Sequence, residues 1–205
     1  MTDLYRRASD RFERVIATAT PSIMQQLPIL DAFLLDALQI QLAAWEERQP
    51  FWSASVLPVA LGIGEECGEL ASANGHDDVV DAIGDIAIYA CQVATRERLA
   101  MSEILAQAGR IADRALATNR GLTHQWRTLT ARVGRVAHLA LKRHQKIREG
   151  ALPDAEYRAL LADALAELLS AVELAACVSV AECFTYTAPT VLARDWSADR
   201  AGGGR

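Results

Sequence analysis

The amino-acid sequence predicts an all-α protein, and three observations support this prediction. Hydrophobic residues make up 51% of the 205 residues, and only 12 are glycine and 6 proline. This composition, rich in alanine and leucine, favours helix over most of the chain. Apolar residues recur at three- and four-residue intervals, as between Leu30 and Leu42, which is the spacing of a helix packed on a core. No segment bounded by turns shows the residue-by-residue alternation of apolar and polar side chains that is typical of a strand, so no strand is expected.

Glycine, proline and capping residues divide this pattern into separate predicted helices. In the first half these are residues 4–19, 29–47, 55–72, 78–96 and 102–117. In the second half they are residues 123–148, 154–181 and 189–198. The breaks are expected at Pro21, Gln49-Pro50, Asn74-Gly75, Asn119-Arg120-Gly121 and Gly150 with Pro153. Asp77 and Ser102 are the expected N-caps of the helices that follow them.

The second group of helices resembles the first, which indicates an internal repeat. The segments 65–70, 81–85 and 111–114 align, in the same order, with 134–139, 163–167 and 191–194. Any two helices rich in alanine and leucine could align in this way, and that remains the alternative. We expect a helical bundle of two hairpin repeats. Its parts are an N-terminal helical extension (1–27), a first repeat (28–118), a degenerate second repeat (119–200) and a disordered tail (201–205).

Charge and cysteine content argue against several classes of function. The formal net charge is −5, so the chain lacks the basic excess that long nucleic acids require. The most apolar run, residues 160–181, carries three acidic residues, which argues against a membrane span. The N-terminus has no apolar segment of a signal peptide. Cys67, Cys91, Cys177 and Cys183 form no C-x-x-C pair, and we expect them to be reduced core residues of a cytoplasmic protein.

Acidic residues gather on two neighbouring predicted helices. At about 100° per residue, Glu65, Glu66 and Glu69 share one arc of their helix. Four aspartates share an arc of the next helix, namely Asp77, Asp78, Asp81 and Asp85. The short turn at 74–76 would make the two helices antiparallel and could bring four carboxylates together. A solvated acidic face is the alternative, although these acids lie in otherwise apolar sequence.

Such a cluster suits a divalent cation. Carboxylates a few ångströms apart raise each other's pKa values or recruit a metal ion, and hard oxygen ligands suit Mg²⁺ or Mn²⁺. Gly68 and Gly84 lie beside the acids. Because glycine costs about 1 kcal/mol in a helix interior, both predict a close approach of helices. His76 could also ligate a metal, but simple exposure in a turn is the preferred interpretation.

Two motifs carry the acids, Glu65-Glu66-Cys67-Gly68-Glu69 and Asp81-Ala82-Ile83-Gly84-Asp85. They resemble the signature of the all-α nucleoside triphosphate pyrophosphatase superfamily, E-E-x-x-E followed by E-x-x-D. That superfamily includes MazG-type enzymes, dimeric dUTPases and phosphoribosyl-ATP pyrophosphohydrolases. The resemblance covers residues 28–117 well and 122–200 faintly. One departure matters: Ala82 stands where the family has glutamate, and Asp81 is the expected substitute.

The resemblance implies a hydrolase that uses Mg²⁺, or Mn²⁺, to split a nucleoside triphosphate into the monophosphate and pyrophosphate. The substrate would be a dNTP or a non-canonical nucleotide removed from the pool. The implied metal ligands are Glu66, Glu69, Asp81 and Asp85. The implied catalytic residues are Glu65, Glu66 and Glu69, with Glu65 or Glu69 orienting a water.

Two alternatives stay open. The chain could be a non-catalytic helical protein that retains the fold and binds nucleotides or partners, having lost its chemistry through Ala82. It could also hydrolyse phosphoribosyl-ATP, but the repeat and the Asp-Ala-x-Gly-Asp form disfavour that activity.

The second repeat carries basic residues where the first carries acids. Arg135 and His138 align with Glu66 and Glu69, so a second metal site is not expected. In the superfamily, active sites form between hairpin subunits. The resemblance therefore implies that a fused copy could turn its basic residues toward the substrate's phosphates. The candidates are Lys142, Lys146 and Arg194. The preferred interpretation of most of these residues is structural, with Asp163 and Glu167 forming salt bridges with Arg135 or Lys142.

Two further substrate contacts are candidates. Arg114 lies where family members place basic contacts to phosphate or to a neighbouring subunit. Trp52 could stack on a nucleobase, as could Trp45 or Trp126, although core packing is the commoner role of such residues. Two fused repeats would pair as a homodimer, since single repeats often assemble in fours. The expected partners are thus a nucleoside triphosphate and a second copy, with no long nucleic acid and no membrane.

Overall fold

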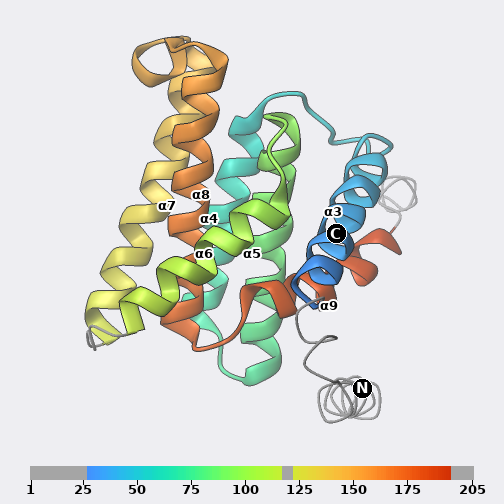
Figure 1. Cartoon of the computed structure of the whole chain (residues 1–205), viewed down its shortest axis with the longest axis vertical. Helices are drawn as coiled ribbons and strands as arrows, with labels where there is room; N and C mark the ends of the chain where they lie inside the picture. Colours follow the sequence, from blue (N-terminus) through green and yellow to red (C-terminus); the bar gives the residue numbers. More distant parts are fainter. Residues whose placement is uncertain (1–26, 117–121, 195–205) are drawn as a thin grey trace, which may run out of the picture. The chain divides into compact units, whose positions relative to one another are not determined.

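The computed structural model describes residues 27–116 and 122–194 (Figure 1). Within these ranges the chain is all-α, with no strand, which confirms the predicted fold class. The helices are α3 (Leu27–Glu46), α4 (Val56–Ser72), α5 (His76–Arg96), α6 (Met101–Leu116), α7 (Leu122–Gln145), α8 (Asp154–Ala176) and α9 (Val180–Leu192), with a 3₁₀ turn η1 (Arg148–Ala151). The predicted helix 4–19 and the tail 201–205 lie outside the described residues.

The chain divides into two compact units, residues 1–34 and 35–205. Of the first unit, the structure describes residues 27–34, which form the beginning of α3. Everything discussed below belongs to the second unit.

Two helical hairpins make up the centre of the second unit (Figure 1). Helices α4 and α5 pack against each other, as do α7 and α8, and α4 also packs on α7. The helix that follows each hairpin crosses to the other one, so that α6 packs on α8 and α9 packs on α5. Each hairpin is therefore packed against one helix that comes from the other half of the chain.

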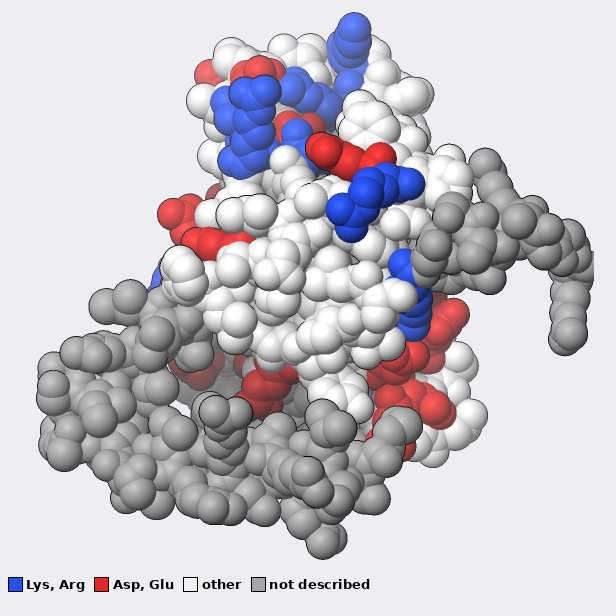
Figure 2. Space-filling model, turned by 90° about the vertical axis from the view of Figure 1, so that its right-hand side faces the viewer, with Lys and Arg blue, Asp and Glu red and all other residues white. Residues whose placement is uncertain are grey.

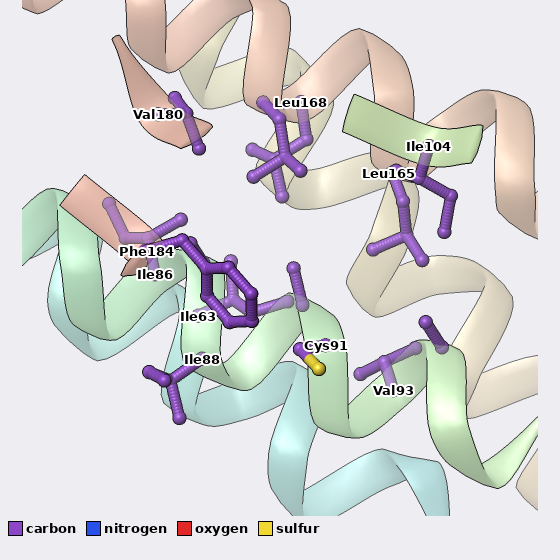
Figure 3. Packing of buried hydrophobic residues seen from close by; sticks show 14 of the residues in the cluster. Ile63, Ile86, Ile88, Cys91, Val93, Ile104, Leu165, Leu168, Val180 and Phe184 are labelled. Atoms are coloured by element: carbon purple, nitrogen blue, oxygen red, sulfur yellow. The ribbon is translucent and has the colours of Figure 1, made fainter. Parts of the chain in front are cut away.

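The core lies where these helices meet (Figure 3). Ile63 from α4, Ile86 from α5, Leu165 from α8 and Phe184 from α9 have no exposed surface. Burying such side chains is the main favourable term in folding, worth about 1.5–3 kcal/mol each. The inward positions recur every three or four residues along each helix, as the sequence pattern predicts.

Polar side chains attach α3 to the corner between α5 and α6. The Gln39 amide donates to the Leu99 carbonyl at 2.8 Å, and the Met101 backbone N–H donates to Oε1 of Gln39 at 2.8 Å. Gln39 thereby satisfies one of the N–H groups that the start of α6 leaves without a helical partner. The sequence pointed to Ser102 as this cap, which is wrong because α6 begins at Met101 and its cap comes from a distant helix.

The predicted helix 154–181 is wrong, because the structure divides it. Helix α8 ends at Ala176, and Cys177 adopts the left-handed conformation with φ of 57°. Ser179 then caps α9, accepting from the N–H of Glu182 at 3.4 Å. The predicted helix 189–198 is likewise wrong, since Pro189 lies inside α9. The sequence did not reveal the break between α8 and α9 because the segments before and after it are equally apolar.

Two smaller expectations also need correction. Asp77 does not cap α5: Gly75 is the N-cap, and Asp77 lies in the first turn, where its negative charge favours the helix dipole. All four cysteines are free, but Cys177 is exposed and not part of the core. Among the described residues, no single helix has the length and apolar content to cross a membrane; α8 and α9 meet that test only as a pair, bent by 98°.

Candidate functional site

The α4–α5 hairpin brings the predicted acidic residues together. Glu66 is 9% exposed, and Asp85, on the facing side of α5, is half-buried. Glu65, Glu69 and Asp81 are exposed around them. The five carboxylates, here called the acidic cluster, therefore have one buried and one half-buried member at the centre and three exposed members at the rim.

The negative charges of these carboxylates act on one another. The pKa of Glu66 is raised to about 7, first by burial and then by the negative charges of the other four members. Burial also raises the pKa of Asp85, and Asp81 and Glu69 raise it further. The charges that act on Glu66 do not include Asp77 or Asp78. These two aspartates lie in the first turn of α5, closer to the hairpin turn.

Position 81 is on the side of α5 that faces the acidic cluster, whereas position 82 is not. Ala82 is 4% exposed and belongs to the hydrophobic core, while Asp81 raises the pKa values of both Glu66 and Asp85. A glutamate at position 82 would be buried in the core of this protein. Asp81 therefore occupies the only one of these two positions from which a carboxylate can reach the others.

The acidic cluster fits a divalent cation by chemistry but is not preassembled around one. A buried carboxylate surrounded by four others lacks the positive charge that would offset their repulsion. Yet within the described ranges, no three His, Cys, Asp or Glu side chains stand close enough to hold a metal ion. His76 is the exposed first residue of α5 and not part of the turn, and the charges that act on Glu66 and Asp85 do not include it.

Tyr89 belongs to this site and was missed in the sequence. It lies one helical turn beyond Asp85, and its pKa is raised first by burial and next by the charge of Glu66. Its ring covers Gly62 of α4, where a β-carbon would lie 2.6 Å from Cε1 of Tyr89. The four-residue spacing from Asp85 was the available signal, but only the glycine opposite makes room for the ring.

Of the two glycines beside the acids, one lies at a close contact between helices and the other does not. Gly84 does mark a close helix approach, because a β-carbon there would lie 2.6 Å from Cβ of Thr187. The approaching helix is α9, however, and not α4. At Gly68 a β-carbon would meet nothing within 4 Å, so the prediction of close packing there is wrong.

Among the predicted phosphate-binding residues, Arg194, just beyond α9, is the one whose charge acts on the acidic cluster. Its positive charge lowers the pKa of Asp85, against the effect of burial. Helix α9 reaches this place because it packs on α5. A residue far along the chain thus supplies a cation beside the first hairpin.

Lys142 and Lys146 lie away from the acidic cluster, contrary to prediction. Helices α4 and α7 run antiparallel (Figure 1), and a β-carbon at Gly64 would lie 3.8 Å from Cγ1 of Val133. From the contact between Gly64 and Val133, α4 continues toward Glu66, whereas α7 continues in the opposite direction. Lys142 therefore lies about 13 Å along α7 from Val133, at 1.5 Å per residue, on the side away from Glu66. Figure 2 shows most basic side chains at the top and a group of acidic ones at the lower right.

Arg114 is not brought to the acidic cluster either. Arg114 is on α6, which packs on the other hairpin, and its Nε donates to the Arg110 carbonyl at 3.2 Å. Trp52 is 46% exposed in the segment before α4. Its neighbour Phe51 packs edge-on against Trp45, with ring centroids 6.3 Å apart, so a contact of Trp52 with the substrate stays a prediction.

In the second hairpin, ion pairs stand in place of an acidic cluster. Arg132 pairs with Glu167 at 2.6 Å, and Arg135 approaches Glu149 at 3.6 Å. Asp163 accepts from the Gln107 amide at 2.8 Å. Salt bridges were the preferred interpretation of these residues, but the expected partners of Asp163 and Glu167, Arg135 and Lys142, are wrong. Lys142 instead donates to Gln145 at 3.1 Å.

Comparison of the chain with family models, with curated proteins and with solved structures gave no match.

Proposed function

We propose that this protein is a Mg²⁺-dependent nucleoside triphosphate pyrophosphohydrolase whose active site is the acidic cluster. The observation that carries the proposal is Glu66, a nearly buried carboxylate with four other carboxylates around it, whose pKa is raised to about 7 first by burial and then by their negative charges. A fold does not retain such repulsion for stability. A bound divalent cation would offset it.

The metal ligands would be Glu66 and Asp85 at the centre, with Glu69 and Asp81 at the rim. Their side chains would turn inward on binding, since they are not gathered around one point without a cation. Bound Mg²⁺ would neutralise the triphosphate and polarise its α-phosphorus toward attack. Glu65, exposed beside Glu66, would orient the attacking water and accept its proton.

Two further residues would act on the substrate. Arg194 would bind a phosphate oxygen, since its charge already reaches Asp85. Tyr89 would donate a hydrogen bond from its hydroxyl to the substrate and keep its proton, because its ring lies against Gly62 and close to Glu66. The acids would thus hold the metal, and these two side chains would fix the triphosphate beside it.

We further propose that the chain is a member of the superfamily that its motifs resemble and that it arose by duplication of a hairpin unit. The reciprocal packing supports this origin, because α6 lies on α8 as α9 lies on α5. The aligned segments also fall on α4 and α7 and on α5 and α8, and the third pair falls on α6 and on the end of α9 with the two residues after it. The second copy would then serve the first by contributing α9 and Arg194.

One observation favours a second candidate, a helical protein that binds nucleotides without hydrolysing them. Among the described residues no preassembled metal-binding group is present. If the side chains cannot turn inward, the substrate's phosphates would bind beside Arg194 without reacting.

Pyrophosphate release from a panel of dNTPs and non-canonical nucleotides, with Mg²⁺ or Mn²⁺, tests the proposal. We expect turnover of at least one substrate, with the monophosphate as the other product, and its loss in Glu66→Gln. The matched control is Glu167→Gln in the second hairpin, which should retain activity. Nucleotide binding without turnover would support the second candidate, and neither binding nor turnover would overturn both.

A further inference from the structure

A hydrogen bond joins α3 to the end of α9 beside the acidic cluster. The indole Nε1 of Trp45 donates to the backbone carbonyl of Arg194 at 2.9 Å. The two residues are 149 positions apart in the chain, so the bond links distant segments. Trp45 is only 4% exposed, which removes it from consideration as a surface for stacking a nucleobase.

This bond acts on a residue that the helix alone does not fix. Helix α9 ends at Leu192, and Arg194 lies beyond it with an exposed side chain. Its backbone N–H donates to the Val191 carbonyl at 3.0 Å. With the Trp45 indole on its carbonyl, Arg194 is held on both sides of its α-carbon, which limits where its guanidinium can go.

Trp45 is itself held firmly against α5. Its neighbour Glu46 forms a two-point ion pair with Arg96, at 2.6 and 2.9 Å, and both side chains are less than a tenth exposed. Arg96 also donates to the carbonyls of Ser53 and Gln92. A buried pair with its remaining donors satisfied is rigid, so the end of α3 provides a fixed base from which the indole holds Arg194.

We propose that Trp45 is a positioning residue: its indole N–H holds the backbone of Arg194, and this keeps the guanidinium beside Asp85. That Arg194 then contacts the triphosphate rests on the proposed function. The positional part of the inference does not, because it concerns only the order of the Arg194 side chain.

Trp45→Phe tests the inference, since phenylalanine retains an aromatic ring but has no donor. Trp126→Phe is the matched control, because Trp126 is a partly buried core tryptophan of α7. The first readout is the ¹⁵N relaxation of the Arg194 Nε–H group. We expect an ordered group in the wild type and in Trp126→Phe, and a disordered one in Trp45→Phe. An equally ordered group in Trp45→Phe would overturn the inference.

The second readout is kinetic and separates positioning from folding. Trp45→Phe should raise KM for the triphosphate about 2- to 10-fold, as expected for the loss of one hydrogen bond, with kcat unchanged. In an Arg194→Gln background the same substitution should have no further effect on KM. Additive effects would overturn the inference. If the wild type shows no turnover, the proposed function fails, and the relaxation measurement still decides the role of Trp45.

Should Trp45→Phe not fold, hydrogen exchange of the wild-type Trp45 indole N–H provides the test. Strong protection, persisting in Arg194→Gln, is the expected result, because the acceptor is a backbone carbonyl. Exchange as fast as that of an exposed indole would overturn the inference.

Discussion

The two hairpins have the same helical arrangement but differ in what surrounds their acidic side chains. In α4–α5, Glu66 and Asp85 lie among other carboxylates, and their pKa values are raised. In α7–α8, Glu167 pairs with Arg132, and Arg135 and His138 approach Glu149. The pKa of Glu149 is lowered, first by a backbone hydrogen bond and then by His138 and Arg135. In the first hairpin the carboxylates repel one another, whereas in the second they form ion pairs with basic side chains.

The difference indicates which hairpin is under a functional constraint. Ion pairs between half-exposed side chains contribute little stability, about 0–1 kcal/mol, so the second hairpin is an ordinary surface. Burying a carboxylate among like charges is unfavourable and persists where a site needs it. The free energy that the first hairpin loses would be recovered when a cation binds.

The largest expected effect is on activity. Asp85→Asn removes one of the two central carboxylates and should lower turnover by more than about 100-fold, as loss of a direct metal ligand does. Glu167→Gln, at the aligned position of the second hairpin, should leave turnover within about twofold. Steady-state pyrophosphate release measures both. Equal losses in the two variants would mean that the hairpins do not differ in function.

The next effect is on stability without metal, and it depends on pH. The folded-state pKa of Glu66 is about 7 against 4.5 for the free side chain. The folded state therefore binds its proton more tightly, and stability falls as pH rises from about 4.5 through 7. Glu66→Gln should remove this loss, stabilising the protein by up to about 3 kcal/mol at pH 8 and little at pH 4.5.

Urea unfolding in the presence of a chelator measures this effect, with the exposed neighbour Glu65→Gln as the control. A variant Glu66→Gln that is less stable than the wild type at pH 8 would contradict the interpretation of the acidic cluster as a source of repulsion.

Glycine substitutions sharpen the comparison of the hairpins' packing. Gly84→Ala would place a β-carbon against Thr187 of α9 and should destabilise the protein by about 1–3 kcal/mol. At Gly68 and at Gly134 in the second hairpin, a β-carbon meets nothing within 4 Å. Alanine there should stabilise by about 0.5–1 kcal/mol. Thermal unfolding of the three variants decides; destabilisation by all three would show that backbone conformation, not contact with α9, governs Gly84.

The smallest effect concerns the ion pair of the second hairpin. A double-mutant cycle on Arg132 and Glu167 should give a coupling of about 0.2–1 kcal/mol, because both side chains are more than a third exposed. The coupling should weaken further in high salt. A coupling of several kcal/mol, insensitive to salt, would mean that the second hairpin also holds charge under strain.

Sequence periodicity was sufficient for most of the helices and for the pairing of Glu66 with Asp85 across the first hairpin. Glu66 and Asp85 lie on the facing sides of two consecutive helices, so the local spacing alone predicts that their side chains lie close together in an antiparallel hairpin. Lys142 and Lys146 were misplaced because the level at which α7 passes α4 depends on long-range packing. Tyr89 was missed because its place depends on Gly62, across the hairpin. The break at Cys177 was missed because composition does not change there.

Thermal unfolding with and without Mg²⁺ tests the central claim, that the first hairpin is a cation site and the second is not. At Mg²⁺ about 100-fold above its Kd, the wild type and Glu167→Gln should unfold about 5–10 °C higher than with a chelator. Asp85→Asn should show no such rise. An equal rise in Asp85→Asn, or none in the wild type, would contradict the claim.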